Sequence, residues 1–434
     1  MGKIKLNSIK ITGSRILFDY SVSDDIKKYF NLQQPFFIEY GEDVSMVPEA
    51  ILAIPFFANF LPVAWVTGSA LCAESADKNF VENVDAIKQA YTDMYPLMSF
   101  GGSLAIQNIV DCSYEKTEKT AAFFSGGVDS FCTLIRNIEK SPVLMTLWGA
   151  DIKLTDIEGW AKVEENTNRV ARTFGVDKIF IKTSFRRVLN NRELDRLSNS
   201  FAGGGWWGCL QHGIAITAHS APTVWLHKVS VQYLGASFCS KDKNIHWASY
   251  PTIDENMVIG SCRTIHDSFE LDRPQKIDEI IRFKRKTDLP INLRVCWESS
   301  GGGNCCQCEK CYRTMMGIIA AGANPKDFGF DMSADSVSLK KIKTFIVWSD
   351  PHGVSLDYLW DPIKDKVKIN KQVLKKSGTY KYIKWLLRVD FSDVQNNRYR
   401  KRQQAVFNVK LAVKKALPNS LLKIKNNPEN QIII

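Results

Sequence analysis

The stretch TAAFFSGGVDSF, residues 120–131, decides the fold of this chain. Residues 121–124 are all apolar, as in a strand that is buried on both faces of a sheet. Two glycines follow, and residues 131–138 continue as a helical segment. A strand that leads through a glycine-rich turn into a helix is the opening unit of an α/β fold.

Short apolar segments alternate with helical segments on the carboxyl side of this unit. We expect further strands at 143–148, 178–182 and 229–236, and helices at 160–174 and 208–219. This alternation predicts a parallel sheet with helices on both faces. Ligands of such sheets bind beyond the carboxyl ends of the strands, which is where the glycine-rich turn falls.

The turn Ser125-Gly126-Gly127-Val128-Asp129-Ser130 has the composition of a phosphate-binding loop. Glycines can adopt positive φ and have no Cβ, so the backbone can curl around an anion at close range. The helix that follows presents free N–H groups to the same point, and both serines supply hydroxyl donors. The aspartate is explained if a Mg²⁺ ion accompanies the phosphates. The alternative is a turn in which Ser and Asp merely cap the helix.

We therefore expect ATP and Mg²⁺ at this loop, with Asp129 and Ser130 as the catalytic residues. Asp151 follows the second predicted strand at the same end of the sheet, where it could meet ribose or metal, although aspartate is also common in turns. The expected ATP-binding residues are Ser125, Gly126, Gly127, Val128, Asp129, Ser130 and Asp151.

The cysteines point to a metal site. The chain has 11 cysteines, and five of them lie between Cys296 and Cys311. The spacing C-x8-C-x2-C-x2-C suits four thiolates around a tetrahedral Zn²⁺, which would be structural because no coordination position stays open; an iron–sulfur cluster is the alternative. A tetrahedral site takes four ligands, so one of the five cysteines is not needed. We exclude Cys306, because counting from Cys305 gives both two-residue gaps, whereas counting from Cys306 does not. The expected ligands are Cys296, Cys305, Cys308 and Cys311.

The glycine-rich loop resembles that of the PP-loop ATP pyrophosphatase superfamily, whose catalytic domain is a Rossmann-like adenine nucleotide alpha hydrolase-like (HUP) domain. The resemblance implies cleavage of ATP between the α- and β-phosphates, adenylation of a substrate oxygen and release of pyrophosphate. It also implies that Ser125, Gly126, Gly127, Asp129 and Ser130 bind pyrophosphate. The loop lacks the Gly-Lys-Ser/Thr of the Walker type, which disfavours γ-phosphate transfer.

The loop and the cysteine spacing together resemble the 7-cyano-7-deazaguanine synthase family of the queuosine pathway and its diverged relatives. Residues 304–314, NCCQCEKCYRT, match that family's zinc stretch, with Cys306 where glycine is usual, and the likeness covers about residues 120–320. It implies a carboxylate substrate joined to an amine or ammonia through an adenylate. Two alternatives stay open: a tRNA-thiolating enzyme that uses Cys209, Cys239 or Cys262, and a non-catalytic nucleotide-binding module of a larger complex.

Four further residues are candidates for contact with the substrate. Trp206 and Trp207 follow a run of glycines and could form a platform for a planar ring, or they could pack in the core. His212 lies within the predicted helix 208–219 and is read more readily as a hydrogen-bonded core histidine than as a base. Tyr250, in Ser249-Tyr250-Pro251, falls where the resembled family has a substrate loop. Spacing alone leaves Glu298, Asp254 and His266 undecided.

The chain divides into three predicted parts. Residues 1–115 form a mixed α/β N-terminal domain that opens with a hairpin over 4–22, residues 116–330 form the catalytic domain with the four-cysteine zinc site, and residues 331–434 form a basic extension. From Lys364 to Lys425 the sequence has 18 Lys or Arg and three acidic residues, so this part carries +15 and the remainder −4. The extension could bind a polyanion, either nucleic acid or an anionic membrane surface through an amphipathic helix over 380–391, or be a solvated helical surface.

The composition favours a globular cytoplasmic protein. Hydrophobic residues make up 45% and charged residues 24% of the chain, no signal peptide is evident, and clustered cysteines suit a reducing compartment. Residues 51–73 carry no charge and could span a bilayer by length, but prolines interrupt them, so we expect a buried segment broken at those prolines. The sequence leaves a homodimer open.

Overall fold

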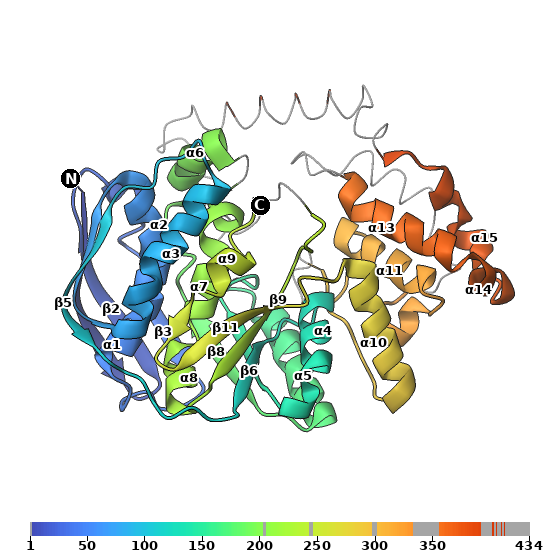
Figure 1. The fold of residues 1–434 in the computed structure, drawn as a ribbon, viewed down its shortest axis with the longest axis horizontal. Coiled ribbons are helices and arrows are strands. Elements are labelled where there is room, and N and C mark those ends of the chain that lie inside the picture. The colour runs from blue at the N-terminus through green and yellow to red at the C-terminus, as the bar shows by residue number, and fades with distance from the viewer. Residues whose placement is uncertain are drawn as a thin grey trace.

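The computed structural model describes residues 2–202, 205–242, 246–296, 302–332 and 356–391, together with Arg402, Ala405, Val409 and Ala412. One eleven-stranded sheet runs through it in the order β10-β11-β9-β6-β7-β8-β3-β2-β1-β4-β5 (Figure 1). The fold is α/β with a mostly parallel sheet, as the alternation of strands and helices predicts.

The centre of the sheet is parallel and holds the strands that the sequence predicts. The predicted strands are β6 (Thr120–Phe123), β7 (Val143–Trp148), β8 (Lys178–Thr183) and β9 (Val231–Gly235). The sequence patterns did not predict β11 (Cys262–Asp267), which pairs with β9, or the short antiparallel β10 (Val258–Ile259) at the edge. Helix α5 ends at Gly175, which has φ 66°, the left-handed conformation that favours glycine. The connecting helices are α4 (Val128–Arg136), α5 (Ile157–Phe174), α6 (Asn191–Ala202), α7 (His212–Ala218), α8 (Ala221–Leu226) and α9 (Pro251–Asp254).

The helix expected over 208–219 is not regular. It opens with a π-helical turn, η3 (Trp207–Gln211), before α7 begins at His212. Such turns insert an extra residue per turn and often occur at functional sites. Hydrophobic periodicity, which tests for the regular spacing of 3.6 residues per turn, does not signal where a π turn is inserted.

The first 110 residues extend the same sheet. Strands β1 (Lys3–Thr12) and β2 (Arg15–Val22) form the predicted hairpin, and β3 (Phe36–Tyr40) pairs antiparallel with β8 of the parallel centre. Strands β4 (Ala70–Asp77) and β5 (Ser103–Val110) follow in parallel with β1. The N-terminal part therefore shares its sheet with the segment that carries the glycine-rich loop.

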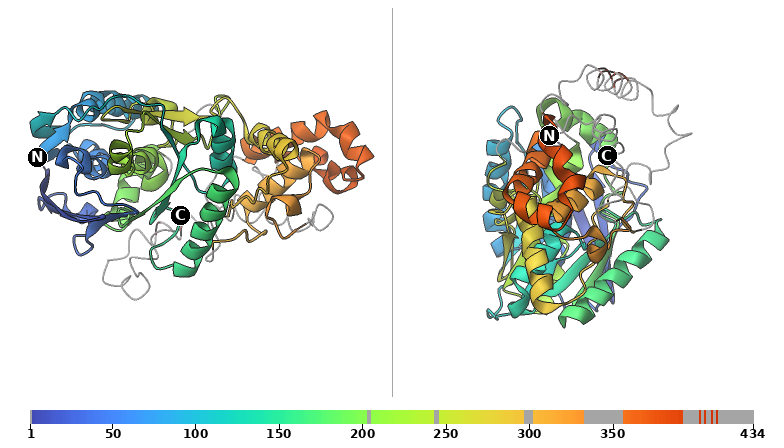
Figure 2. Two further views of the ribbon diagram at one scale, coloured as in Figure 1. Left: turned by 90° about the horizontal axis from the view of Figure 1, so that it is seen from below. Right: turned by 90° about the vertical axis from the view of Figure 1, so that its right-hand side faces the viewer.

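The uncharged segment 51–73 is largely buried, as expected, and it breaks at Ala53, just before Pro55 in the first turn of the next helix, but not at Pro62. It forms α1 (Glu49–Leu52) and α2 (Ile54–Thr67), and α2 ends at Gly68, with φ 65°. Pro62 lies inside α2, where its missing N–H costs one hydrogen bond. Helices α2 and α7 are in contact on the concave side of the curved sheet (Figure 2), with α3 (Lys78–Met94) beside them. No helix among the described residues has the length and apolar character needed to cross a bilayer.

The chain after β11 forms a helical group at one end of the molecule (Figure 1). Helix α10 (Arg273–Thr287) packs against α4, and α11 (Glu309–Ala320) follows the cysteine cluster. The amphipathic helix predicted over 380–391 is wrong in part, since the segment forms two short pieces. The remaining helices are η4 (Pro325–Phe328), α13 (Leu356–Ile369), α14 (Lys371–Lys376), α15 (Tyr380–Ile383) and the 3-10 helix η5 (Lys384–Arg388).

Candidate functional site

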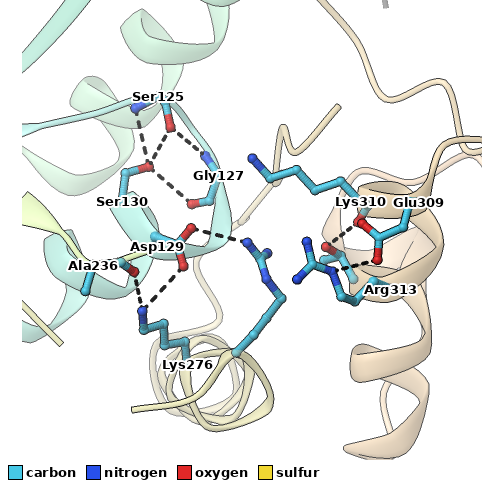
Figure 3. Close-up of polar contacts among 11 residues, drawn as sticks. Ser125, Gly127, Asp129, Ser130, Ala236, Lys276, Glu309, Lys310 and Arg313 are labelled. Carbon is cyan, nitrogen blue, oxygen red and sulfur yellow. Dashed lines mark hydrogen bonds and ion pairs between the residues drawn. The ribbon is translucent and has the colours of Figure 1, made fainter. Parts of the chain in front are cut away.

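The predicted phosphate loop lies between β6 and α4, at the carboxyl end of the parallel strands. Gly126 has φ 79°, and Gly127 is the N-cap of α4, so the chain turns sharply into the helix. The hydroxyl of Ser130 accepts from the Ser125 N–H at 3.3 Å and donates to the Gly127 carbonyl at 3.2 Å (Figure 3). These bonds hold the turn in shape, with the first N–H groups of α4 at its inner side.

A glycine outside the loop, Gly235, allows this turn to lie close to the sheet. A Cβ on Gly235, at the end of β9, would lie 2.9 Å from the backbone of Asp129. Any side chain at that position would therefore displace the first turn of α4. The sequence signal for this contact is weak, because Gly235 stands alone and far from the loop.

Asp129 is held by two cations from α10. Its carboxylate lies 3.3 Å from Arg273 and 3.5 Å from Lys276, and Lys276 also donates to the carbonyl of Ala236 (Figure 3). Lys276 is only 1% exposed. An ammonium group that is so deeply buried needs such partners, because burial without them would cost several kcal/mol, on the order of the desolvation of one ion.

Helix α11 brings two more cations to the same place. Lys310 extends from α11 toward Gly127, and the guanidinium of Arg313, paired with Glu309 at 3.0 Å, points to the side of Asp129 (Figure 3). The loop thus faces four basic side chains and two acidic ones. This excess of positive charge beside free helix N–H groups suits a polyphosphate.

The electrostatics of the site agree with this geometry. Burial alone would raise the pKa of Asp129, but the nearby charges, led by Arg273 and Lys276, outweigh it and lower the pKa. The pKa of Lys310 is lowered, first by burial and then by repulsion from Arg273. The cations repel one another in the absence of a further anion, so bound phosphate groups would relieve the repulsion.

Asp151, which the sequence suggests as a further ATP-binding residue, acts on this site through its charge. It follows β7, and its negative charge acts on Lys310, on His212 and on Arg186. Burial lowers the pKa of Arg186 to about 10 and that of His212 to about 4. The charge of Asp151 therefore acts both on Lys310, beside the phosphate loop, and on a second, aromatic part of the site.

The four predicted substrate residues take different positions. Trp206 is fully buried, so it offers no face for stacking in this structure. Trp207 is partly exposed and carries Arg186 over its ring at 3.8 Å, with the ring of His212 at 4.8 Å. Tyr250 is the N-cap of α9, with its ring 5.2 Å from Phe269. Trp207 and His212 thus share one aromatic group, from which Trp206 and Tyr250 are apart.

The four predicted metal ligands meet in one cluster. Their sulfur atoms all lie within 4.8 Å of one another, with Cys296 to Cys308 at 3.7 Å and Cys305 to Cys311 at 3.9 Å. A tetrahedron with Zn–S bonds of about 2.3 Å has edges of about 3.8 Å, so the spacing fits Zn²⁺. The cluster could hold such a metal ion. Cys306 lies outside it, with φ 53°, a backbone conformation that favours glycine.

The cysteine cluster is linked directly to the phosphate loop. The N–H of Arg294, two residues before Cys296, donates to the Gly126 carbonyl at 2.7 Å, and its guanidinium bonds the carbonyls of Gly302 and Ser125. A metal that fixes Cys296 would therefore also fix the segment around Arg294 that supports the loop.

Residues 254 and 266, which the sequence left undecided, form a buried hydrogen-bonded pair. Asp254 lies 2.8 Å from Nδ1 of His266 and accepts from the Ser249 hydroxyl at 2.7 Å. Glu298 falls outside the described residues. The candidate site residues that the sequence analysis missed are the cations Arg186, Arg273, Lys276, Arg294, Lys310 and Arg313. The available signal was the i,i+3 spacing of Arg273 with Lys276 and of Lys310 with Arg313.

Comparison of the chain with models of protein families, with curated proteins and with solved structures finds no match. The structure and the cysteine geometry therefore stand alone as evidence. They support an α/β fold with a mostly parallel sheet and a cluster of four cysteines suited to a metal ion such as zinc.

Proposed function

We propose that this chain is an ATP-dependent enzyme that adenylates a carboxylate, releases pyrophosphate, and releases AMP when an amine or ammonia attacks the adenylate. The observation that carries the proposal is the convergence of Arg273, Lys276, Lys310 and Arg313 on the Ser-Gly-Gly loop. The resemblance of the loop and the cysteine spacing to 7-cyano-7-deazaguanine synthase supports it from the sequence.

In the first step a carboxylate oxygen attacks the α-phosphorus of ATP, and the bond to the bridging oxygen breaks. Pyrophosphate leaves with that electron pair, so negative charge builds where the loop N–H groups and the cations of α10 and α11 are already placed. Mg²⁺, which would be held by Asp129 with Asp151 on the same side, supplies further charge neutralisation. In the second step the amine attacks the acyl carbon and AMP leaves.

The sulfur-transfer alternative fits the structure less well. A thiolating enzyme needs an accessible cysteine that ionises near neutral pH. Cys209, Cys239 and Cys262 are all buried, and burial raises the pKa of each, to about 11 for Cys209. The other alternative, a nucleotide-binding module without catalysis, would form neither AMP nor pyrophosphate, so measuring these products distinguishes it from the proposal.

The test uses ATP labelled at the α-phosphate, Mg²⁺ and the small-molecule fraction of a cell extract. We expect labelled AMP and an equal amount of pyrophosphate from the wild-type chain. Asp129→Asn with Ser130→Ala should reduce AMP formation by about a hundredfold or more, since two groups at the developing charge are lost. Asp85→Asn, on the exposed side of α3, is the matched control. ADP as the product, or equal AMP from the double variant, would sink the proposal.

A further inference from the structure

A strongly basic surface belongs to three short pieces in the helical group. Residues 371–388, which cover α14, α15 and η5, contain six basic residues and no acidic residue. All six are exposed, and none forms an ion pair with a described acidic side chain. We call this the tail surface; its basic members are Lys371, Lys375, Lys376, Lys381, Lys384 and Arg388.

Aromatic side chains are interleaved with these cations. Tyr380, Tyr382 and Trp385 are all partly exposed. The ammonium of Lys381 lies 4.7 Å from the ring centre of Tyr382, and that of Lys375 lies 5.9 Å from the ring centre of Tyr380. Cations and aromatic faces are therefore within reach of the same ligand.

The tail surface is fixed to the rest of the fold. The side-chain amide of Asn370, between α13 and α14, donates to the Ala320 carbonyl at the end of α11, and Lys366 pairs with Asp278 of α10. Figure 1 shows α13 to α15 beside α10 and α11. The short helices are thus held on the same two helices that carry the cations of the phosphate site.

The apolar side of this segment is already in use. Ile383 and Leu386 are fully buried, and Phe391 stacks on Trp360 at 5.8 Å between ring centres. A helix that lies in a membrane surface needs a free, continuous apolar face to enter the lipid. The two short pieces lack that face, because their apolar residues pack inward. We therefore do not expect this segment to insert into a lipid surface.

We propose that the tail surface binds a single-stranded nucleic acid, with the lysines against backbone phosphates and the exposed tyrosine faces against bases. Lysine-rich grooves with interleaved aromatic residues bind single strands with little sequence preference. The exposed apolar side chains of Ile369 (78%) and Val373 (57%) border the cations and can contact base faces. This proposal is independent of the adenylating reaction.

The test measures anisotropy of fluorescein-labelled oligo-dT and oligo-rU of about 20 nucleotides with the full chain in about 0.1 M salt. The charge variant is Lys375→Gln/Lys381→Gln/Lys384→Gln, and its matched control is Lys3→Gln/Lys5→Gln/Lys10→Gln on the exposed side of β1. We expect the charge variant to raise Kd about tenfold or more and to reduce the salt slope by about two, since each phosphate contact contributes about 0.7. The control should change Kd less than about twofold.

A third variant separates stacking from charge. Tyr382→Leu should weaken binding severalfold and leave the salt slope unchanged, because it removes a stacking face and no charge. Equal weakening by the tail and β1 triple variants would overturn the proposal, as would tighter binding to duplex DNA than to single strands. Binding to phosphatidylserine vesicles without binding to either oligonucleotide would assign the surface to membranes instead.

Discussion

Asp129 illustrates how a single residue serves more than one purpose. The sequence suggests a ligand of Mg²⁺, whereas the structure shows a carboxylate that holds Arg273 and the buried Lys276 in place. The two roles are compatible, because bound phosphate groups would take over the cations and release the carboxylate toward a metal ion. The residue type was predictable from the loop, but the partners were not, since they lie more than a hundred residues away.

His219, in the core, is also fixed by specific partners. Its Nδ1 lies 2.5 Å from the carbonyl of Ala215, so this nitrogen donates, and its Nε2 accepts from the hydroxyl of Thr183 at 3.0 Å. The imidazole is therefore neutral with a defined tautomer and ties α7 to β8. Burial lowers the pKa of His219 from 6.5 to about 4, although the bond to Ala215 acts in the opposite direction.

The first prediction concerns acid stability. Because the pKa of His219 is lower in the folded state, its contribution to stability is complete above pH 6.5 and is lost as the pH falls toward 4. The full difference is about 3 kcal/mol in the free energy of unfolding. His219→Gln should destabilise the protein at neutral pH, and its gap from wild type should narrow at about pH 4.5. Urea unfolding at both pH values measures the gap, and a constant gap would contradict the assignment.

At the scale of elements, the site depends on helix starts. Helix α10 begins with a capping box in which Asp272 accepts from the Gln275 N–H and the Gln275 side chain accepts from the Asp272 N–H. The cap orients the first turn, which presents Arg273 and Lys276 to the loop. This start could be predicted from the sequence Asp-Arg-Pro-Gln, whereas its position opposite α4 depends on packing that no local pattern specifies.

The second prediction concerns the link from the cysteine cluster to the phosphate loop. Cys305→Ser should lower the zinc content and weaken binding of α,β-methylene-ATP about tenfold, because the segment that bonds Gly126 is no longer held. Cys306→Gly is the matched control: it changes the adjacent residue, keeps all four ligands and relieves a positive φ. Metal analysis and titration calorimetry provide the two readouts. Equal affinity for the two variants would show that the cluster does not support the loop.

At the scale of the whole molecule, most strands of the parallel centre and the N-terminal hairpin were predictable, whereas the order in which the strands pair was not. Buried strands, glycine turns and the cysteine spacing leave local signals, so 143–148 and 178–182 were placed nearly to the residue. The pairing of β3 with β8 joins Ile38 to Thr183, and hydrophobic alternation does not say which strands become neighbours. The domain boundary predicted at residue 115 therefore does not separate two sheets.

Several buried contacts reinforce this continuity. The hydroxyl of Tyr91 donates to the carbonyl of Leu210 at 3.0 Å, and that of Tyr95 donates to Cys209 at 2.8 Å. The side chains of Asn59 and Gln211 are hydrogen-bonded where α2 meets η3. All three contacts join the first hundred residues to the segment beside the aromatic part of the site.

The third prediction follows from this shared core. Because one sheet and one set of buried hydrogen bonds cross residue 115, residues 2–332 should unfold in a single calorimetric transition. A saturating Mg²⁺ complex of α,β-methylene-ATP should move that transition as a whole to higher temperature, since a ligand that binds only the folded state stabilises everything that unfolds with its site. Tyr95→Phe should lower the same transition by a few degrees, as expected for the loss of about 1 kcal/mol at a buried hydrogen bond. Two transitions, of which the nucleotide shifts one and Tyr95→Phe the other, would instead show that the N-terminal part folds independently despite the continuous sheet.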